Sequence, residues 1–148
     1  MNRIVLDTNV LVSGMINAHG APGRIVDLVR EEHVKLVVDD RVLSEYGEVL
    51  RRPRFNRYFD VSAVRDVVLF LEQNTIYVVP VRSITDLPDP DDAPFAELAL
   101  SAAVPLVTGN ADHYPESLRH SIDVLTPAGY LKQRERAHAE RETRADKR

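Results

Sequence analysis

The sequence predicts an α/β domain in which a central, mostly parallel sheet of about five strands lies between two layers of helices. The first observation is that the apolar runs are short and show little alternation, which is typical of strands covered on both faces. The second is that segments with apolar residues at helical spacing lie between these runs, as in βα units. We find no internal repeat and no linker that would mark a second domain.

The first strand is predicted at residues 4–6, a run too short and too rich in β-branched residues for a helix, which stops at Asp7. Later apolar runs predict strands at residues 35–38, 76–79, 106–108 and 122–125. Helical spacing predicts helices at residues 10–17, 23–32, 41–51, 63–73 and 93–103. We expect one domain over residues 1–131 and a charged C-terminal tail over residues 132–148, either helical or frayed.

At 148 residues, with 44% apolar and 28% charged residues, the chain has the composition of a globular protein. The longest apolar run, residues 67–71, has five residues, whereas a membrane span needs roughly 18, so we expect no membrane association. No apolar segment of secretory length follows the N-terminus, which predicts no signal peptide. The absence of cysteine excludes Cys-ligated zinc and thiolate chemistry, and the expected location is cytoplasmic.

The formal net charge of −4 is unevenly distributed along the chain. Residues 132–148 carry a net charge of +3, and residues 1–131 carry −7. A domain with this charge attracts nucleic acid poorly as a whole. Any polyanion that it binds must therefore be held by local basic patches or through bound cations.

Two acidic residues are expected at the carboxyl edge of the sheet. Asp7 ends the first predicted strand, and Asp112 follows the fourth. Ligands of open parallel sheets bind in the crevice outside the carboxyl ends of the strands. The two aspartates are therefore expected to meet there.

Glu45 can be placed by helical geometry. The apolar residues of the helix predicted at 41–51 form one stripe, and at about 100° per residue Glu45 borders this stripe while Glu48 lies nearly opposite its centre. Glu45 is therefore expected to reach an interior site, and Glu48 is expected to face water.

The segment DDAPFAELALSAA begins with two candidate acids, Asp91 and Asp92. Phe95 and Leu98 belong to the expected buried stripe of the helix, and both aspartates head that stripe. The same geometry points Glu97 away from the buried stripe. Helical geometry alone does not choose between Asp91 and Asp92.

Carboxylates that share a crevice repel one another and must take up protons or be neutralised by cations. With oxygen ligands and no closely spaced histidines, the fitting ion is Mg²⁺ or Mn²⁺. Such an ion activates water and stabilises the charge that develops on a leaving oxygen, which suits phosphodiester hydrolysis. The acidic domain and a polyanionic substrate are then compatible, because the metal supplies the positive charge.

Four segments in order resemble the PIN domain family, specifically its branch of VapC-like toxin components of toxin–antitoxin systems. They are DTNVLVSG after the first strand, LSEYGEVLRRPRF on a helix, DPDDAPFAELALSAAVPLVTG, and residues 110–112. The resemblance covers about residues 3–126. It implies a three-layer PIN-like fold and a divalent-metal-dependent ribonuclease that cuts single-stranded RNA.

The resemblance also implies roles for individual residues. The acidic quartet that holds the metal and performs catalysis would be Asp7, Glu45, Asp92 and Asp112, which selects Asp92 over Asp91. The polar residues that support it would be Asn9, Thr108 and Asn110. Many relatives have an acidic residue where this chain has Asn110, which leaves open which residue completes a second metal site. A cognate antitoxin protein and a homodimer are further expectations from the resemblance.

The stretch RRPRFNRYF places four arginines among three aromatic residues. Basic side chains beside rings that can stack on bases are typical of single-stranded nucleic acid grooves, so we expect this stretch to bind RNA. The candidate RNA-binding residues are Arg51, Arg52, Arg54 and Arg57. The alternative is that the arginines lie near a helix C-terminus and the aromatic rings are buried.

Simpler roles exist for each acid: Asp7 and Asp92 could cap helices, Glu45 could be a solvated helix residue, and Asp112 a turn residue. Two other functions remain as alternatives. A phosphotransferase of the haloacid dehalogenase or response-regulator kind would need a lysine near the later strands, and residues 80–131 contain none. A non-catalytic RNA-binding or scaffold domain would keep the fold without turnover, and Asn110 at an often acidic position keeps this alternative open.

Overall fold

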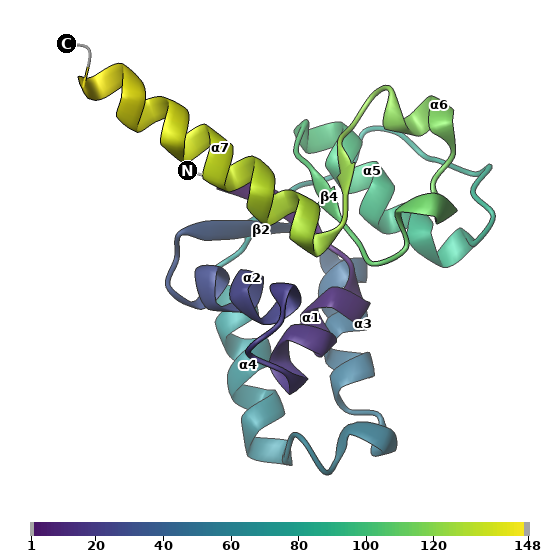
Figure 1. Ribbon diagram of the computed structural model, residues 1–148. Helices are drawn as coiled ribbons and strands as arrows, with labels where there is room; N and C mark the ends of the chain where they lie inside the picture. Colours follow the sequence, from purple (N-terminus) through teal and green to yellow (C-terminus); the bar gives the residue numbers. More distant parts are fainter. Residues whose placement is uncertain (1, 147–148) are drawn as a thin grey trace.

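Five parallel strands form the central sheet of the computed structural model, which describes residues 2–146 (Figure 1). The strands are β1 (Asn2–Leu6), β2 (Val34–Val38), β3 (Ile76–Tyr77), β4 (Leu106–Val107) and β5 (Val124–Leu125). Their order is β3-β2-β1-β4-β5, and every neighbouring pair is parallel. The predicted α/β class is confirmed, and the sheet is parallel throughout instead of mostly parallel.

The order of the strands reverses at β1. The chain adds β2 and β3 on one side of β1 and then returns to add β4 and β5 on the other side. Such a reversal leaves a crevice outside the carboxyl ends of the two strands where it occurs, here β1 and β4. The register pairs Leu6 with Val107, so the residues that follow these two strands emerge side by side.

Helices cover both faces of the sheet. They are α1 (Thr8–Ile16), α2 (Ala21–Arg30), α3 (Asp40–Leu50), α4 (Val61–Gln73), α5 (Ala93–Ala102), α6 (Glu116–Arg119) and α7 (Pro127–Asp146). α2 packs against β2, and α5 packs against β1, β2 and β4. Because β1–β2 and β3–β4 are right-handed crossovers in opposite directions, α2 and α5 lie on opposite faces. The consecutive burial of Ile4, Val5 and Leu6 agrees with a sheet covered on both sides.

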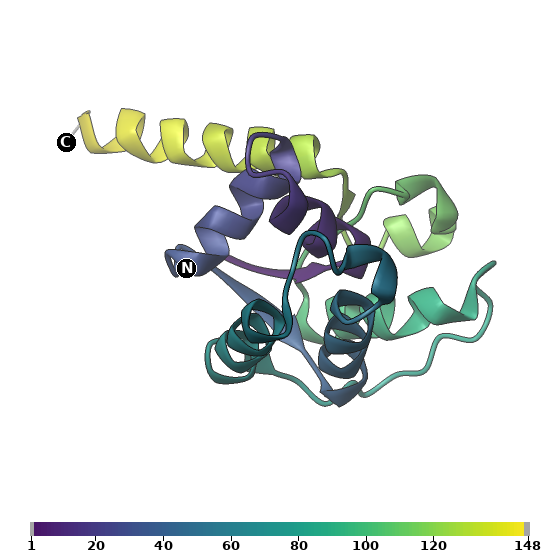
Figure 2. The ribbon, with the colours of Figure 1, turned by 90° about the horizontal axis from the view of Figure 1, so that it is seen from below.

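The helices that carry the acidic residues are neighbours. α3 lies beside α4 on one side and beside α5 on the other (Figure 2). Short 3₁₀ turns occur at η1 (Pro53–Phe55), η2 (Pro90–Asp92) and η3 (Ala111–His113), and neither these nor α6 were predicted. α1 begins at Thr8, two residues before its predicted start, because the Asp7 carbonyl accepts the amides of Val10 and Leu11 at 3.0 and 3.2 Å.

The outer strands are shorter than predicted. β3 ends at Tyr77 because its partner β2 ends at Val38, and the last contact is the Val78 amide donating to the Val38 carbonyl at 3.0 Å. The chain then leaves the sheet, and the Val79 side chain is 86% exposed. Apolar residues that extend past the end of the neighbouring strand have no backbone groups to pair with, so they leave the sheet. The sequence alone does not show where the neighbouring strand ends.

The long helix α7 crosses the predicted boundary between domain and tail without a break. Tyr130 and Leu131 are buried against the core, and most of the helix beyond them is exposed and extends away from the sheet (Figure 1). The tail is therefore helical through Asp146, and residues 147–148 lie outside the described part of the chain. The division into domain and tail stays a prediction. Among residues 2–146, no helix is both long and apolar enough to span a membrane.

Candidate active site

Asp7 lies at the carboxyl end of β1, where the strand order reverses. Its side chain is buried, and one oxygen, Oδ2, accepts a hydrogen bond of 2.7 Å from the Thr108 hydroxyl at the end of β4. The Asn110 amide donates to the same hydroxyl oxygen at 3.1 Å, which leaves the hydroxyl proton for Asp7. The Asp7 side chain makes no capping hydrogen bond to α1. The simple capping role is therefore not what this carboxylate does.

Glu45 reaches the same region from α3. It is half-buried, and its Oε2 atom accepts a hydrogen bond from the Thr8 hydroxyl at the start of α1. The next residue, Tyr46, is fully buried and donates from its hydroxyl to the Leu6 carbonyl at 2.5 Å, which fixes α3 to the end of β1. The Glu48 side chain is 73% exposed. Both predictions from helical geometry, for Glu45 and for Glu48, agree with the structure.

Asp92 is the third acid of the region and ends the turn η2 immediately before α5. It is half-buried, whereas Asp91 is exposed. Burial, followed by the charges of Asp7 and Asp89, raises the pKa of Asp92 to about 6, against the opposing effect of His113. Asp91 is not remote from the region, because its charge contributes to the raised pKa of Glu45, and the choice of Asp92 over Asp91 stays a prediction.

The three carboxylates act on one another electrostatically. Burial raises the pKa of Glu45, with the Thr8 hydrogen bond opposing the shift and the charge of Asp7 adding to it. The charge of Glu45 in turn contributes to the raised pKa of Asp92. Asp7, Glu45 and Asp92 therefore form a cluster with excess negative charge, which we call the acidic site.

Asp112, the fourth predicted acid, differs from the other three in its exposure. Its side chain is fully exposed and makes an ion pair of 3.6 Å with Arg119. Arg119 also donates to the backbone carbonyls of Ala111 and Tyr114, at 2.5 and 3.0 Å, and so fixes the turn η3 that carries Asp112. The role of Asp112 in catalysis or metal binding stays a prediction.

Of the three predicted supporting residues, one is buried against the acidic site and two are exposed. Thr108 is fully buried and bonded to Asp7, as a supporting role requires. Asn9 is exposed on α1, and Asn110 is exposed and contributes its backbone amide, not its side chain, to the Thr108 hydroxyl.

Tyr114 is a neighbour of the acidic site that sequence analysis missed. It is 2% exposed, and its hydroxyl has no hydrogen-bond partner among residues 2–146. Burial, followed by the charges of Asp92 and Asp7, raises its pKa, so the phenol stays protonated. The phenol is therefore a free donor beside the acids. A lone tyrosine two residues after Asp112 carries no motif that would have indicated this.

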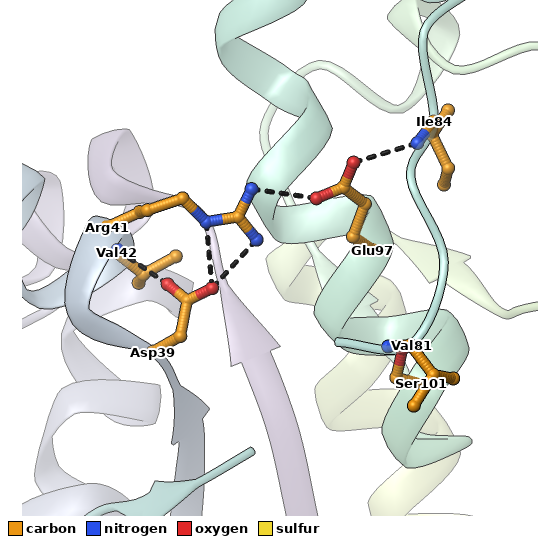
Figure 3. A network of polar contacts seen from close by, with 7 residues as sticks. All are labelled: Asp39, Arg41, Val42, Val81, Ile84, Glu97 and Ser101. Carbon is orange, nitrogen blue, oxygen red and sulfur yellow. Dashed lines mark hydrogen bonds and ion pairs between the residues drawn. The ribbon is translucent and has the colours of Figure 1, made fainter. Parts of the chain in front are cut away.

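Glu97 contradicts its predicted orientation. It is only 6% exposed, and its two carboxylate oxygens accept hydrogen bonds from Arg41 and from the Ile84 amide, each at 2.8 Å (Figure 3). The prediction failed because α5 is buried on more sides than its apolar stripe suggests. An arginine from α3 provides the partner that makes the burial of this carboxylate possible.

The donor set suits a hard divalent cation by its chemistry. It consists of carboxylate oxygens that carry unneutralised negative charge, with an unpartnered buried hydroxyl beside them. Across residues 2–146, however, no three acidic or histidine side chains converge closely enough to enclose a metal ion. Thr8 holds the Glu45 carboxylate by a hydrogen bond, and Thr108 holds that of Asp7. To bind an ion, the carboxylates of the acidic site must draw closer together than they lie here.

We expect Asp92 to make stability depend on pH. Its pKa of about 6 in the folded state lies above the value of about 4 for an unfolded chain, so the folded state binds more protons between these values. Without metal, the free energy of unfolding of the wild type should fall relative to Asp92→Asn as the pH rises from about 4 to about 6, and stay lower above it. Urea unfolding in EDTA across this range measures the difference, and parallel pH profiles of the two proteins would contradict it.

The arginine-rich stretch connects α3 to α4, at the end of the α3–α4 hairpin remote from α7 (Figure 1). The Arg54 guanidinium lies 4.8 Å from the centre of the Phe55 ring, and that of Arg57 lies 4.9 Å from the Tyr58 ring. Phe59 is buried in a small cluster with Val64, whereas Tyr58 is 45% exposed. The surface therefore offers exposed arginines with one accessible ring, and RNA binding by these arginines stays a prediction.

Comparison with known proteins gives two matches. The sequence profile of the PIN domain family matches residues 3–112. Uncharacterized protein MJ1680 of Methanocaldococcus jannaschii is 27% identical over 111 residues, a region that covers 74% of this chain and 72% of that protein. The matched range of residues contains the positions of Asp7, Glu45, Asp92 and Asp112.

Proposed function

Because this chain belongs to the PIN domain family, whose members are generally nucleases that use divalent metal ions, we propose that it is a divalent-metal-dependent endoribonuclease that hydrolyses phosphodiester bonds of single-stranded RNA. The observation that carries the proposal is that Asp7, Glu45 and Asp92 lie in one region, at the carboxyl end of β1 where the strand order reverses, near enough for the charge of Asp7 to raise the pKa of the other two. The phosphotransferase alternative does not agree with the family.

In the proposed reaction, Asp7, Glu45 and Asp92 would hold Mg²⁺ or Mn²⁺. A bound divalent ion supplies activation of water and stabilisation of the charge on the leaving oxygen. Thr108 and Thr8 each hold one carboxylate in a fixed orientation by a hydrogen bond. Without a cation, the three negative charges repel a phosphate group, so the substrate binds productively only after the site is neutralised.

The choice of single-stranded RNA as substrate rests on the arginine-rich stretch. Single-stranded nucleic acids are bound by basic side chains that track the backbone and by rings that stack on bases. Arg54, Arg57 and the partly exposed Tyr58 provide both kinds of group. Because residues 1–131 carry a net charge of −7, RNA binding depends on such a local basic patch or on bound cations.

The VapC-like resemblance extends the proposal to the biological role. We propose that the protein is the toxin of a type II toxin–antitoxin pair, that a cognate antitoxin protein covers or distorts its site, and that it works as a homodimer in the cytoplasm, where its RNA substrate is found. The non-catalytic RNA-binding alternative is favoured by one observation, the full exposure of Asp112 and its pairing with Arg119. The two functions differ in whether bound RNA is cut.

Cleavage of a labelled single-stranded RNA tests the proposed function directly. The wild type should cut it with Mn²⁺ or Mg²⁺ and should not cut it in EDTA, while a duplex RNA of the same sequence should be cut more slowly. Gel analysis of the products over time measures both rates. Binding of the RNA without cleavage by a folded, metal-supplied protein would overturn the nuclease proposal in favour of the scaffold.

A further inference from the structure

An ion network of two buried carboxylates and one half-exposed arginine joins α3 to α5 (Figure 3). The Arg41 guanidinium lies between two carboxylates: its Nε and Nη2 atoms donate to Asp39 Oδ2 at 2.9 and 2.7 Å, and its Nη1 atom donates to Glu97 Oε1 at 2.8 Å. Asp39 and Arg41 lie at the start of α3, and Glu97 lies on α5. The network therefore connects the helix that carries Glu45 to the helix that follows Asp92.

Every carboxylate oxygen of the network is occupied. The second oxygen of Asp39 accepts the Val42 amide at 3.0 Å, and the second oxygen of Glu97 accepts the Ile84 amide at 2.8 Å. The side chains of Asp39 and Glu97 are only 12% and 8% exposed. The Arg41 side chain is 47% exposed, so its ion pairs add little net stability, but the hydrogen bonds of its guanidinium to two carboxylates favour one relative position of α3 and α5.

The network also anchors the loop that leads to Asp92. Residues 78–89, between β3 and η2, contain no helix or strand. This loop is tied to α5 at two points, where Glu97 accepts the Ile84 amide and where the Ser101 hydroxyl accepts the Val81 amide at 3.2 Å (Figure 3). Glu97 therefore holds both the helix after Asp92 and the loop before it.

The network is close enough to the acidic site to control its spacing. Arg41 precedes Glu45 by one turn of α3, so the two side chains lie on the same face of the helix. Glu97 follows Asp92 by five residues, or about 8 Å along a helix axis. A shift of α5 relative to α3 would move the Glu45 and Asp92 carboxylates apart.

We propose that Arg41 and Glu97 are positioning residues, which hold α3 and α5 in the relative position from which Glu45 and Asp92 can draw together around a divalent cation. The inference rests on the proposed function, because it assumes that the acidic site takes up Mg²⁺ or Mn²⁺. Neither residue touches the cation or the substrate. Their effect passes through the relative position of α3 and α5, and a small misplacement of ligands costs affinity disproportionately.

Mn²⁺ binding measured by calorimetry on the full chain tests the inference without relying on activity. Glu97→Gln keeps the size of the side chain but replaces one acceptor oxygen with an NH₂ group, which cannot accept from Arg41 or from Ile84. We expect its Mn²⁺ affinity to fall by about 10-fold. Arg41→Lys retains the charge but loses the fork that binds two carboxylates, and a weaker loss in the same direction is expected. If Glu97→Gln does not fold, Mn²⁺ binding by Arg41→Lys tests the inference instead.

Ile25→Ala is the matched control. Ile25 is fully buried in α2, which packs on α1, α7 and β2, so this variant lowers Tm without disturbing the network. Weaker Mn²⁺ binding by Glu97→Gln, with wild-type affinity in Ile25→Ala, supports the inference. Wild-type affinity in both network variants overturns it and leaves the nuclease proposal intact. No Mn²⁺ binding by the wild type overturns the proposed function itself, and the positioning role with it.

Discussion

Asp7→Asn should abolish metal-dependent RNA cleavage, with kcat/KM lower by about a thousandfold, equivalent to about 4 kcal/mol of transition-state stabilisation. Asp7 is the buried acid at the end of β1 and influences the pKa of both Glu45 and Asp92. The amide keeps the size of the side chain and can still accept from Thr108, but it removes the charge that attracts a cation. Initial rates of RNA cleavage in Mn²⁺ measure the effect.

The loss should not result from unfolding. Asn at position 7 removes a repulsion with Glu45 and Asp92, so the metal-free variant should be at least as stable as the wild type near neutral pH. Asp66→Asn, which alters an exposed residue of α4, is the matched control and should cut RNA at the wild-type rate. Undiminished cleavage by Asp7→Asn would remove this residue from the site.

Thr108→Val should weaken Mn²⁺ binding by about 10- to 100-fold, the range observed when partners of metal ligands are lost. The substitution keeps the shape of a fully buried side chain but removes the hydroxyl that donates to Asp7. The Asp7 carboxylate then loses its fixed orientation, and the Asn110 amide loses its acceptor. Stability should also fall, by about 1–3 kcal/mol, because buried polar groups are left without partners.

Thr75→Val provides the comparison for this prediction. Thr75 lies just beyond the end of α4, and its hydroxyl also donates a hydrogen bond, to the Leu71 carbonyl at 2.6 Å. This bond orients none of the acids of the acidic site. Calorimetry with Mn²⁺ and urea unfolding of both variants separate the two effects. Equal Mn²⁺ affinities of Thr108→Val and Thr75→Val would show that the Thr108 hydroxyl does not support the site.

The sequence predicted those parts of the fold that depend on local pattern. The uninterrupted apolar run before Asp7 identified a strand covered on both sides, and β1 is buried over Ile4, Val5 and Leu6. Helical periodicity placed Glu45 at the edge of the buried face of α3, where the structure has it. Because these features follow from a short uninterrupted apolar run and from the helical period of 3.6 residues, they can be predicted before any tertiary contact is known.

The features that were missed depend on partners distant in the sequence. Glu97 is buried because Arg41, 56 residues earlier, reaches it from another helix. Tyr114 is buried near Asp7, 107 residues earlier, whose charge contributes to the raised pKa of the phenol. Periodicity assigns a charged residue to solvent by default, and only the tertiary structure shows which ones have a buried partner.

β1 precedes the other four strands of the sheet in the sequence, and one of its two neighbours, β4, follows it by about 100 residues. Asp7 and the Thr108 hydroxyl that orients it are 101 residues apart. While the chain is being synthesised, Asp7 has no partner hydroxyl, and the edge of β1 that β4 will cover is open. The Asp7 carboxylate of the acidic site is therefore not oriented on a nascent chain until β4 has emerged. The nuclease activity proposed here can then act on the translating ribosome's messenger RNA only after β4 has been made.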